Sequence, residues 1–157
     1  MINPQDYPRD RFFLTKEQVM EMNPHRHEFQ QCDGILHFDK EENLIVARRD
    51  VLEDEFWVRG HIPDRPIFPG VLMCETLAQV ASIHAQMLVE KPNGAFIGFG
   101  AIDEVRFRGM VTPGTELWVA GTMEKYSSHR TFFKWRGNLL TADGSVVCSG
   151  LITGMAL

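Results

Sequence analysis

The sequence lacks several features that mark secreted, membrane-spanning and nucleic-acid-binding proteins. It has only three cysteines and no CxxC spacing, which argues against a disulfide framework or a zinc ribbon and fits a reducing compartment. No stretch approaches the ~18 uninterrupted apolar residues of a membrane span, and the charged N-terminus has no apolar core of a secretory signal. Basic residues do not dominate either, since 16 Lys and Arg stand against 21 Asp and Glu for a net charge of -5. We therefore expect a cytoplasmic protein that neither enters a membrane nor binds nucleic acid.

No internal repeat, low-complexity tract or linker rich in Gly, Ser or Pro divides the chain. Its 157 residues are 44% hydrophobic and 24% charged, which is close to the average of globular domains. A chain of this length can bury about two-thirds of its unfolded surface without disulfides or metals. We expect residues 1–157 to form a single domain.

The pattern of apolar residues and turn signals predicts one long helix and about six strands. Residues 71–90 contain no helix breaker and follow a segment, residues 60–70, whose three prolines and two glycines exclude regular structure. A shorter helix should begin after the capping box at Thr15 and end before Pro24. Because tight turns join most of the strands, the expected fold is α+β, an antiparallel sheet wrapped round the long helix. Strands are predicted at 34–38, 44–51, 96–107, 116–126, 130–140 and 146–156.

The long predicted helix is apolar on nearly every side, which is typical of a buried helix. Its polar exceptions, Glu75, Gln79, Ser82 and Gln86, are spaced by four, three and four residues and therefore lie on one face. One small sheet cannot cover such a helix completely. We therefore expect a homodimer in which the two central helices lie near each other.

His61 and Glu75 are the strongest candidates for catalysis. His61 lies in the stiff Pro/Gly segment, and Glu75 lies near the start of the apolar helix. A buried, unpaired carboxyl group has a raised pKa, which suits a general acid near neutral pH, and a histidine in a rigid loop can act as the partner base. The alternative is structural, with Glu75 favouring the helix dipole and His61 a surface or capping residue.

Other titratable residues are weaker candidates. His25, His27 and His37 lie close together in the sequence, but nothing makes them converge as the ~4 ligands of a metal site would. His84, on the long helix, fits a core or interface position. The cysteines fit packing roles, because a carboxylate near Cys74 would deactivate its thiol.

Residues 60–72 read GHIPDRPIFPGVL and are followed by Glu75 and by Ala-Gln at 78–79. This segment resembles GHFPxxPxxPGVLxxExxAQ, the signature of the beta-hydroxyacyl-acyl carrier protein dehydratases. The glutamate at position 75 resembles the plain dehydratase branch, whereas the related dehydratase-isomerases carry aspartate there.

Two flanking segments strengthen the resemblance. Residues 24–33, PHRHEFQQCD, resemble the family's PHRxPFxxxD, and residues 102–114, IDEVRFRGMVTPG, resemble its IDxxRFRxxVxPGD. Together the similar segments cover about residues 17–156, which is nearly the whole chain.

The resemblance implies a hotdog fold and the loss of water from a 3-hydroxyacyl thioester to give the trans-2-enoyl thioester, in fatty-acid or related acyl-chain biosynthesis. It also implies a homodimer, often assembled further into hexamers, with active sites at the subunit interface. His61 of one subunit and Glu75 of the other would meet there. His61 would remove the alpha proton, and Glu75 would protonate the departing hydroxyl. No cofactor and no metal is required.

Further residues receive roles in this mechanism. The N–H groups of Gly70 and Val71, at the start of the long helix, would hold the developing oxyanion of the thioester. Gln79 would orient the Glu75 carboxyl or a water. Aromatic residues that could line an acyl-chain tunnel rather than pack in the core are Phe68, Phe96 and Phe99.

An acyl carrier protein would deliver the substrate on a phosphopantetheine arm. Because such carriers are acidic, a basic rim should receive them. The candidates for this rim are Arg106 and Arg108, with Arg130 and Arg136 as further candidates. The alternative for each of them is an ordinary solvated arginine on the face of a strand.

The sequence departs from the family pattern at a few positions. Ile62 and Asp64 stand where the family usually has Phe and Gly, Gln30 and Gln31 replace residues that are usually apolar, and residues 1–16 form a longer N-terminal extension. These departures suggest a specialised relative.

Two other functions fit the same fold. A hotdog thioesterase would use a carboxylate to activate water and would not need the His61 loop. A non-catalytic acyl-binding or assembly subunit would have no need of His61 and Glu75.

A last expectation concerns the backbone: we predict a strained or cis peptide between His61 and Pro66.

Overall fold

The computed structural model describes residues 2–88, 97–127 and 132–156. The helices are α1 (Lys16–Met22) and α2 (Gly70–Leu88), and two 3-10 turns, η1 (Pro4–Asp6) and η2 (His27–Phe29), accompany them. The strands are β1 (Gly34–Asp39), β2 (Leu44–Asp50), β3 (Ile97–Phe107), β4 (Glu116–Ser127), β5 (Phe132–Thr141) and β6 (Val146–Ala156). Within the described residues these bounds confirm the predicted helices and strands, and residues 89, 90, 96, 130 and 131 of the predicted elements lie outside them. The capping box at Thr15 is formed with Gln18.

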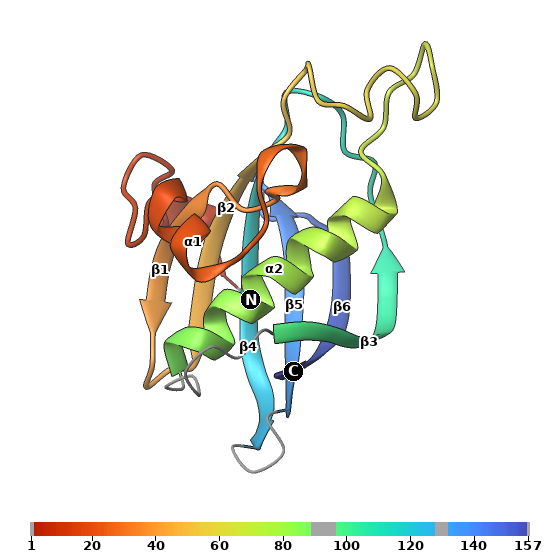
Figure 1. Ribbon diagram of the computed structural model, residues 1–157. Coiled ribbons are helices and arrows are strands. Elements are labelled where there is room, and N and C mark those ends of the chain that lie inside the picture. Colours follow the sequence, from red (N-terminus) through yellow and green to blue (C-terminus); the bar gives the residue numbers. More distant parts are fainter. Residues whose placement is uncertain (1, 89–96, 128–131, 157) are drawn as a thin grey trace.

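The six strands form one antiparallel sheet in the order β1-β2-β4-β5-β6-β3. Figure 1 shows α2 lying across one face of this sheet, with α1 beside it. The segment between β2 and α2 extends beyond the end of the sheet, next to the loop that follows β3. The expected α+β hotdog arrangement is confirmed, and it leaves β1 and β3 as the edge strands.

Trp135 on β5 packs between the sheet and α2. Its ring is fully buried and lies against Gly121 and Gly137, where an added Cβ would come within 1.9 and 2.0 Å of ring atoms. The two glycines therefore leave the space that the indole fills. Its N–H donates to Nδ1 of His84 on α2 over 3.0 Å, which ties the helix to the sheet.

His84 lies in the core, which is one of the two positions, core or interface, that the sequence predicts for it. It is fully buried, and burial lowers the pKa of its imidazole to about 4, so the ring is neutral at pH 7. Because Nδ1 accepts from Trp135, the ring proton lies on Nε2, and the ring meets Phe38 edge-on with centroids 5.7 Å apart.

The three cysteines are free, as expected. Burial raises the pKa of Cys32 and of Cys148 to about 12 and also raises the pKa of Cys74. Thiols with raised pKa values are poor nucleophiles, so packing is the role that the structure supports.

The N-terminal extension runs along the sheet. The Gln5 side chain donates to Ala142 O over 2.9 Å, and the indole N–H of Trp118 donates to Tyr7 O over 3.0 Å.

No helix in the described part of the chain is both long and apolar enough to cross a bilayer.

Candidate active site

The loop that carries His61 is held by its own backbone. The His61 N–H donates to Trp57 O over 2.7 Å, and Nδ1 of the ring lies 2.7 Å from Ile67 O. Because a carbonyl oxygen can only accept, Nδ1 carries the proton of the neutral ring and Nε2 keeps its lone pair. Nε2 is therefore the atom that a general base would use.

The same loop is strained, although not through a cis bond. No peptide among the described residues is cis, so that form of the prediction is wrong. Instead Ile62 has φ 57° and Asp64 has φ 71°. Residues other than glycine avoid this left-handed region of backbone conformation, and β-branched residues such as isoleucine avoid it most. Asp64 stands where the family usually has glycine, the residue that adopts such a φ without cost.

The start of α2 offers free hydrogen-bond donors. Within the described residues, no hydrogen bond uses the N–H of Gly70 or of Val71, whereas the next two N–H groups, of Leu72 and Met73, donate to the carbonyl of Pro69. Gly70 also allows close packing, since a Cβ there would come within 2.9 Å of the Phe107 ring. Two unpaired donors at the positive end of a helix can hold an anionic oxygen.

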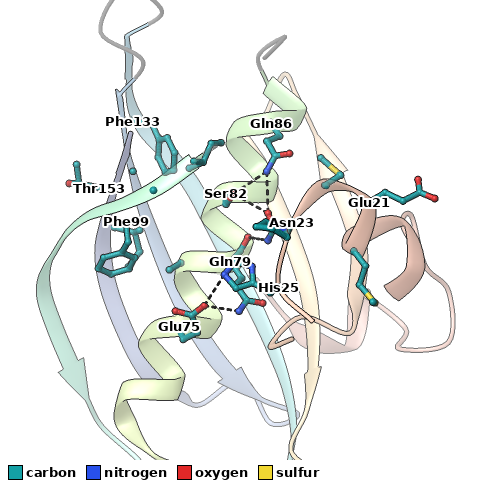
Figure 2. A pocket seen from close by; sticks show the side chains of 18 of the residues that line it. Glu21, Asn23, His25, Glu75, Gln79, Ser82, Gln86, Phe99, Phe133 and Thr153 are labelled. Carbon is teal, nitrogen blue, oxygen red and sulfur yellow. Dashed lines mark hydrogen bonds and ion pairs between the residues drawn. The ribbon is translucent and has the colours of Figure 1, made fainter. Parts of the chain in front are cut away.

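The polar stripe of α2 lines a cleft of about 460 Å³. Figure 2 shows Glu75, Gln79, Ser82 and Gln86 along one side of this cleft. The opposite sides come from residues 20–26 and from residues of β3, β5 and β6. The prediction that the stripe lies on one face is confirmed.

Gln79 holds the Glu75 carboxyl. Its amide nitrogen donates to Glu75 Oε1 over 2.7 Å and also to Phe29 O over 2.7 Å. Its amide oxygen accepts from the N–H of Gln31 over 2.9 Å. Gln79 is 1% exposed, so these partners fix its orientation, and the contact with Glu75 is the one that its predicted role requires.

His25, which is only a weak candidate from the sequence, is a second partner of Glu75. Its Nε2 lies 3.3 Å from Glu75 Oε1, and both side chains line the cleft (Figure 2). The sequence signal for His25 was its place in the PHR motif, which says nothing of which side chain it meets. Only the fold brings residue 25 beside residue 75.

His61 and Glu75 are not brought together within one chain. Glu75 and Gln79 line the cleft, but His61 is not among the described residues that do. Their predicted pairing therefore depends on a second copy of the chain, and it stays a prediction.

The residues predicted to line a tunnel have different positions. Phe99 is 53% exposed and lines the cleft. Phe68 is buried against Trp57, with ring centroids 5.5 Å apart, and belongs to the core cluster. Phe96 lies outside the described residues.

The predicted basic rim is exposed in part. Arg106 and Arg108 are exposed at the end of β3, and Arg108 donates to Ser149 Oγ over 2.6 Å. Arg136 is bound between two carboxylates, those of Glu104 and Glu124, which makes it a poor docking site for a carrier. Arg130 falls outside the described residues.

Comparisons with known proteins agree with this architecture. Residues 23–150 match the model of the FabA-like domain. A 3-hydroxyacyl-acyl-carrier-protein dehydratase, FabZ, from Tolumonas auensis is 37% identical over 87% of this chain and 90% of its own. The FabZ dehydratase from Erwinia tasmaniensis is 38% identical over 86% of this chain and 87% of its own length.

Solved structures extend the likeness in fold. The dehydratase heterocomplex ApeI:P from Xenorhabdus doucetiae matches with a TM-score of 0.73 and 15% identity, over 94% of this chain and 93% of that one. So low an identity shows a common fold and nothing about activity. The family model and the close relatives go further: the chain belongs to the FabA-like family.

Proposed function

We propose that this protein is a 3-hydroxyacyl-acyl-carrier-protein dehydratase, a hydro-lyase of fatty-acid or related acyl-chain biosynthesis. The relatives that match most of the chain carry this name. The observation that carries the proposal is the carboxyl of Glu75, held by Gln79 in a cleft, a short distance along α2 from unpaired N–H groups.

The reaction needs a base, an acid and a site for negative charge. Nε2 of His61 takes the proton from the alpha carbon, and the electrons of that bond form the carbon–carbon double bond. The carbon–oxygen bond at the beta carbon breaks, and Glu75 gives its proton to the departing hydroxyl, which leaves as water. One proton is taken up and one is released, so the step balances without a cofactor.

The start of α2 stabilises the charge that develops in this step. As the alpha proton leaves, negative charge moves onto the thioester oxygen. The N–H groups of Gly70 and Val71 are free to donate to that oxygen, and the helix dipole favours it. These donors are oriented before the substrate arrives, so little reorganisation is needed.

We further propose that each active site is shared between two chains. The cleft holds Glu75 without His61, so a complete site needs a second source of the base. Val71, next to this site, is 77% exposed, and Phe107 on the edge strand β3 is 55% exposed. A partner chain that covers these apolar residues would bring its own His61 loop to the cleft. Assembly of such dimers into a hexamer would leave this arrangement unchanged.

The substrate would arrive on an acyl carrier protein that docks near Arg106 and Arg108. Their guanidinium groups are exposed at the end of β3, close in sequence to Phe107, whose ring packs on Gly70. The three free cysteines fit a cytoplasmic location.

Hydration of a trans-2-enoyl thioester, the reverse reaction, tests the proposal directly. Loss of the conjugated absorbance can be followed without a coupling enzyme. We expect wild-type protein to hydrate the substrate, and His61→Ala and Glu75→Gln each to lower kcat by roughly 10²-fold or more.

A thioesterase would release free thiol from the same substrate instead, and a non-catalytic subunit would do neither. Either result with purified, folded protein would contradict the proposal. A thiol reagent added to the same reaction separates these outcomes.

A further inference from the structure

A buried arginine lies behind the Glu75 site. Arg49, on β2, is 4% exposed, and its Nε donates to the side-chain oxygen of Gln31 over 3.1 Å. The backbone N–H of Gln31 donates in turn to Gln79, the residue that holds the Glu75 carboxyl. Arg49 is thus connected to Glu75 through two buried glutamines.

The other end of Arg49 reaches the loop that carries His61. Its Nη2 lies 2.6 Å from Oε2 of Glu55, and the indole N–H of Trp57 donates to the same oxygen over 2.8 Å. The carbonyl of Trp57 accepts the backbone N–H of His61 over 2.7 Å. The Arg49 guanidinium also lies over the ring of Phe68, 5.4 Å from its centroid.

We propose that Arg49 is a positioning residue for both proposed catalytic groups of its own chain, acting through Gln31 and Gln79 on Glu75 and through Glu55 and Trp57 on the His61 loop. The inference rests on the proposed function for the meaning of "catalytic", but the hydrogen-bonded connection itself does not. If each site is shared between two chains, every Arg49 ties together groups that serve two different sites.

Gln31 explains how a buried arginine is tolerated here. Arg49 carries donors in several directions, and Glu55 and the Asp50 carbonyl satisfy its two terminal nitrogens. Nε is left for Gln31, the fully buried residue that replaces a usually apolar one. An apolar side chain at position 31 would leave this N–H buried and unpaired.

The adjacent Gln30 provides a matched control. It is also buried and also replaces a usually apolar residue, but its amide donates to Cys32 O and its side-chain oxygen has no partner within the described structure. Gln30→Leu therefore removes the same groups as Gln31→Leu, one residue away, without touching Arg49.

The experiment compares these two variants in the hydration assay. We expect Gln31→Leu to lower kcat by about tenfold with KM within about twofold, because the catalytic groups shift while the cleft remains. Gln31→Glu restores an acceptor for Arg49 but loses the amide that donates to Glu28 O over 2.9 Å, so it should recover part of the loss. Gln30→Leu should match the wild type. Equal kcat values for the two leucine variants would overturn the proposal.

A second variant covers the case in which Gln31→Leu folds poorly. Arg49→Lys keeps a positive charge opposite Glu55 but loses the fork that joins Glu55 to Gln31. We expect it to reproduce the loss in kcat. Full activity of Arg49→Lys would contradict the positioning role.

A readout without turnover separates this inference from the proposed function. The chain has three tryptophans, so Trp57→Phe identifies the indole N–H resonance of Trp57 by its disappearance. Gln31→Leu should shift that resonance, and Gln30→Leu should not. An unmoved resonance in Gln31→Leu would refute the connection even in an active enzyme. A wild type with no hydration activity would refute the proposed function but leave this spectral test decisive for the connection.

Discussion

At the scale of single residues, the position of the Glu75 carboxyl is set by its contacts. The carboxyl accepts from Gln79 and lies beside His25, so its position is set from two directions. Such preorganisation matters because a general acid must meet the departing hydroxyl at hydrogen-bond distance. A substrate in the cleft would therefore encounter a carboxyl group that is already oriented.

The contact with His25 leads to a testable prediction. His25→Leu removes one of the two groups that orient Glu75, and we expect kcat for enoyl-thioester hydration to fall by about tenfold. His25→Gln can still donate to the carboxyl and should lose less. The matched control is His27→Asn, since His27 is exposed and asparagine tolerates its φ of 53°. A His25→Leu enzyme as fast as the control would remove His25 from the site.

A second prediction concerns His84 and acid stability. Burial lowers the pKa of His84 from 6.5 to about 4, so between these pH values the unfolded chain binds a proton that the folded chain does not. The free energy of unfolding should therefore decrease as pH falls from about 6.5 to about 4, with a contribution from this residue of up to about 3 kcal/mol.

His84→Gln isolates that contribution from those of the carboxylates, because glutamine can accept from Trp135 but does not titrate. Urea denaturation at pH 7 and pH 4.5 should show a smaller loss of stability in the variant. Equal losses in the two proteins would show that His84 does not contribute.

At the scale of elements, the long helix and the sheet were readable from the sequence because their boundaries are marked by local chemistry. Prolines and glycines precede α2, and an apolar run without breakers follows. The stripe of Glu75 and Gln79 was also readable, since helical spacing alone places them on one face. These features depend on nearest neighbours in the chain.

What could not be read were contacts between distant elements. The contact of His25 with Glu75 and the hydrogen bonds that link Gln79, Gln31 and Arg49 depend on how residues 25–31 and β2 pack against α2. The same limit applies to Trp135, whose place under α2 requires two glycines on different strands. The prediction of a cis peptide was wrong, since the chain turns in this loop through positive φ values at Ile62 and Asp64 instead.

The packing of Trp135 beneath α2 gives a third prediction. Gly137→Ala would place a Cβ within 2.0 Å of the Trp135 ring and 3.0 Å of Leu77 on α2, so the core must shift. We expect a loss of about 3 kcal/mol in the free energy of unfolding, measured by urea denaturation. Gly60→Ala, where no atom lies within 4 Å of the added Cβ, should change stability by less than about 0.5 kcal/mol. Similar stabilities of the two variants would mean that the indole is not held as described.

At the scale of the whole molecule, the cleft of one chain holds only part of the proposed site. The cleft contains Glu75, the proposed acid, and the groups that orient it, while the His61 loop extends beyond the end of the sheet (Figure 1). The proposed mechanism needs both groups on one substrate. Under the proposed mechanism, a second copy of the chain would supply the base without any new chemistry.

Complementation between inactive chains is the most direct test of this shared site. His61→Ala and Glu75→Gln are co-expressed with different tags, and the mixed dimer is isolated by two affinity steps and confirmed by native mass. Each mixed dimer then contains one site with both wild-type groups and one site with neither. We predict that it recovers about half of the wild-type kcat per dimer, while each mutant homodimer stays roughly 10²-fold below it. A mixed dimer of correct mass that is as inactive as the homodimers would contradict a site made by His61 of one chain and Glu75 of the other.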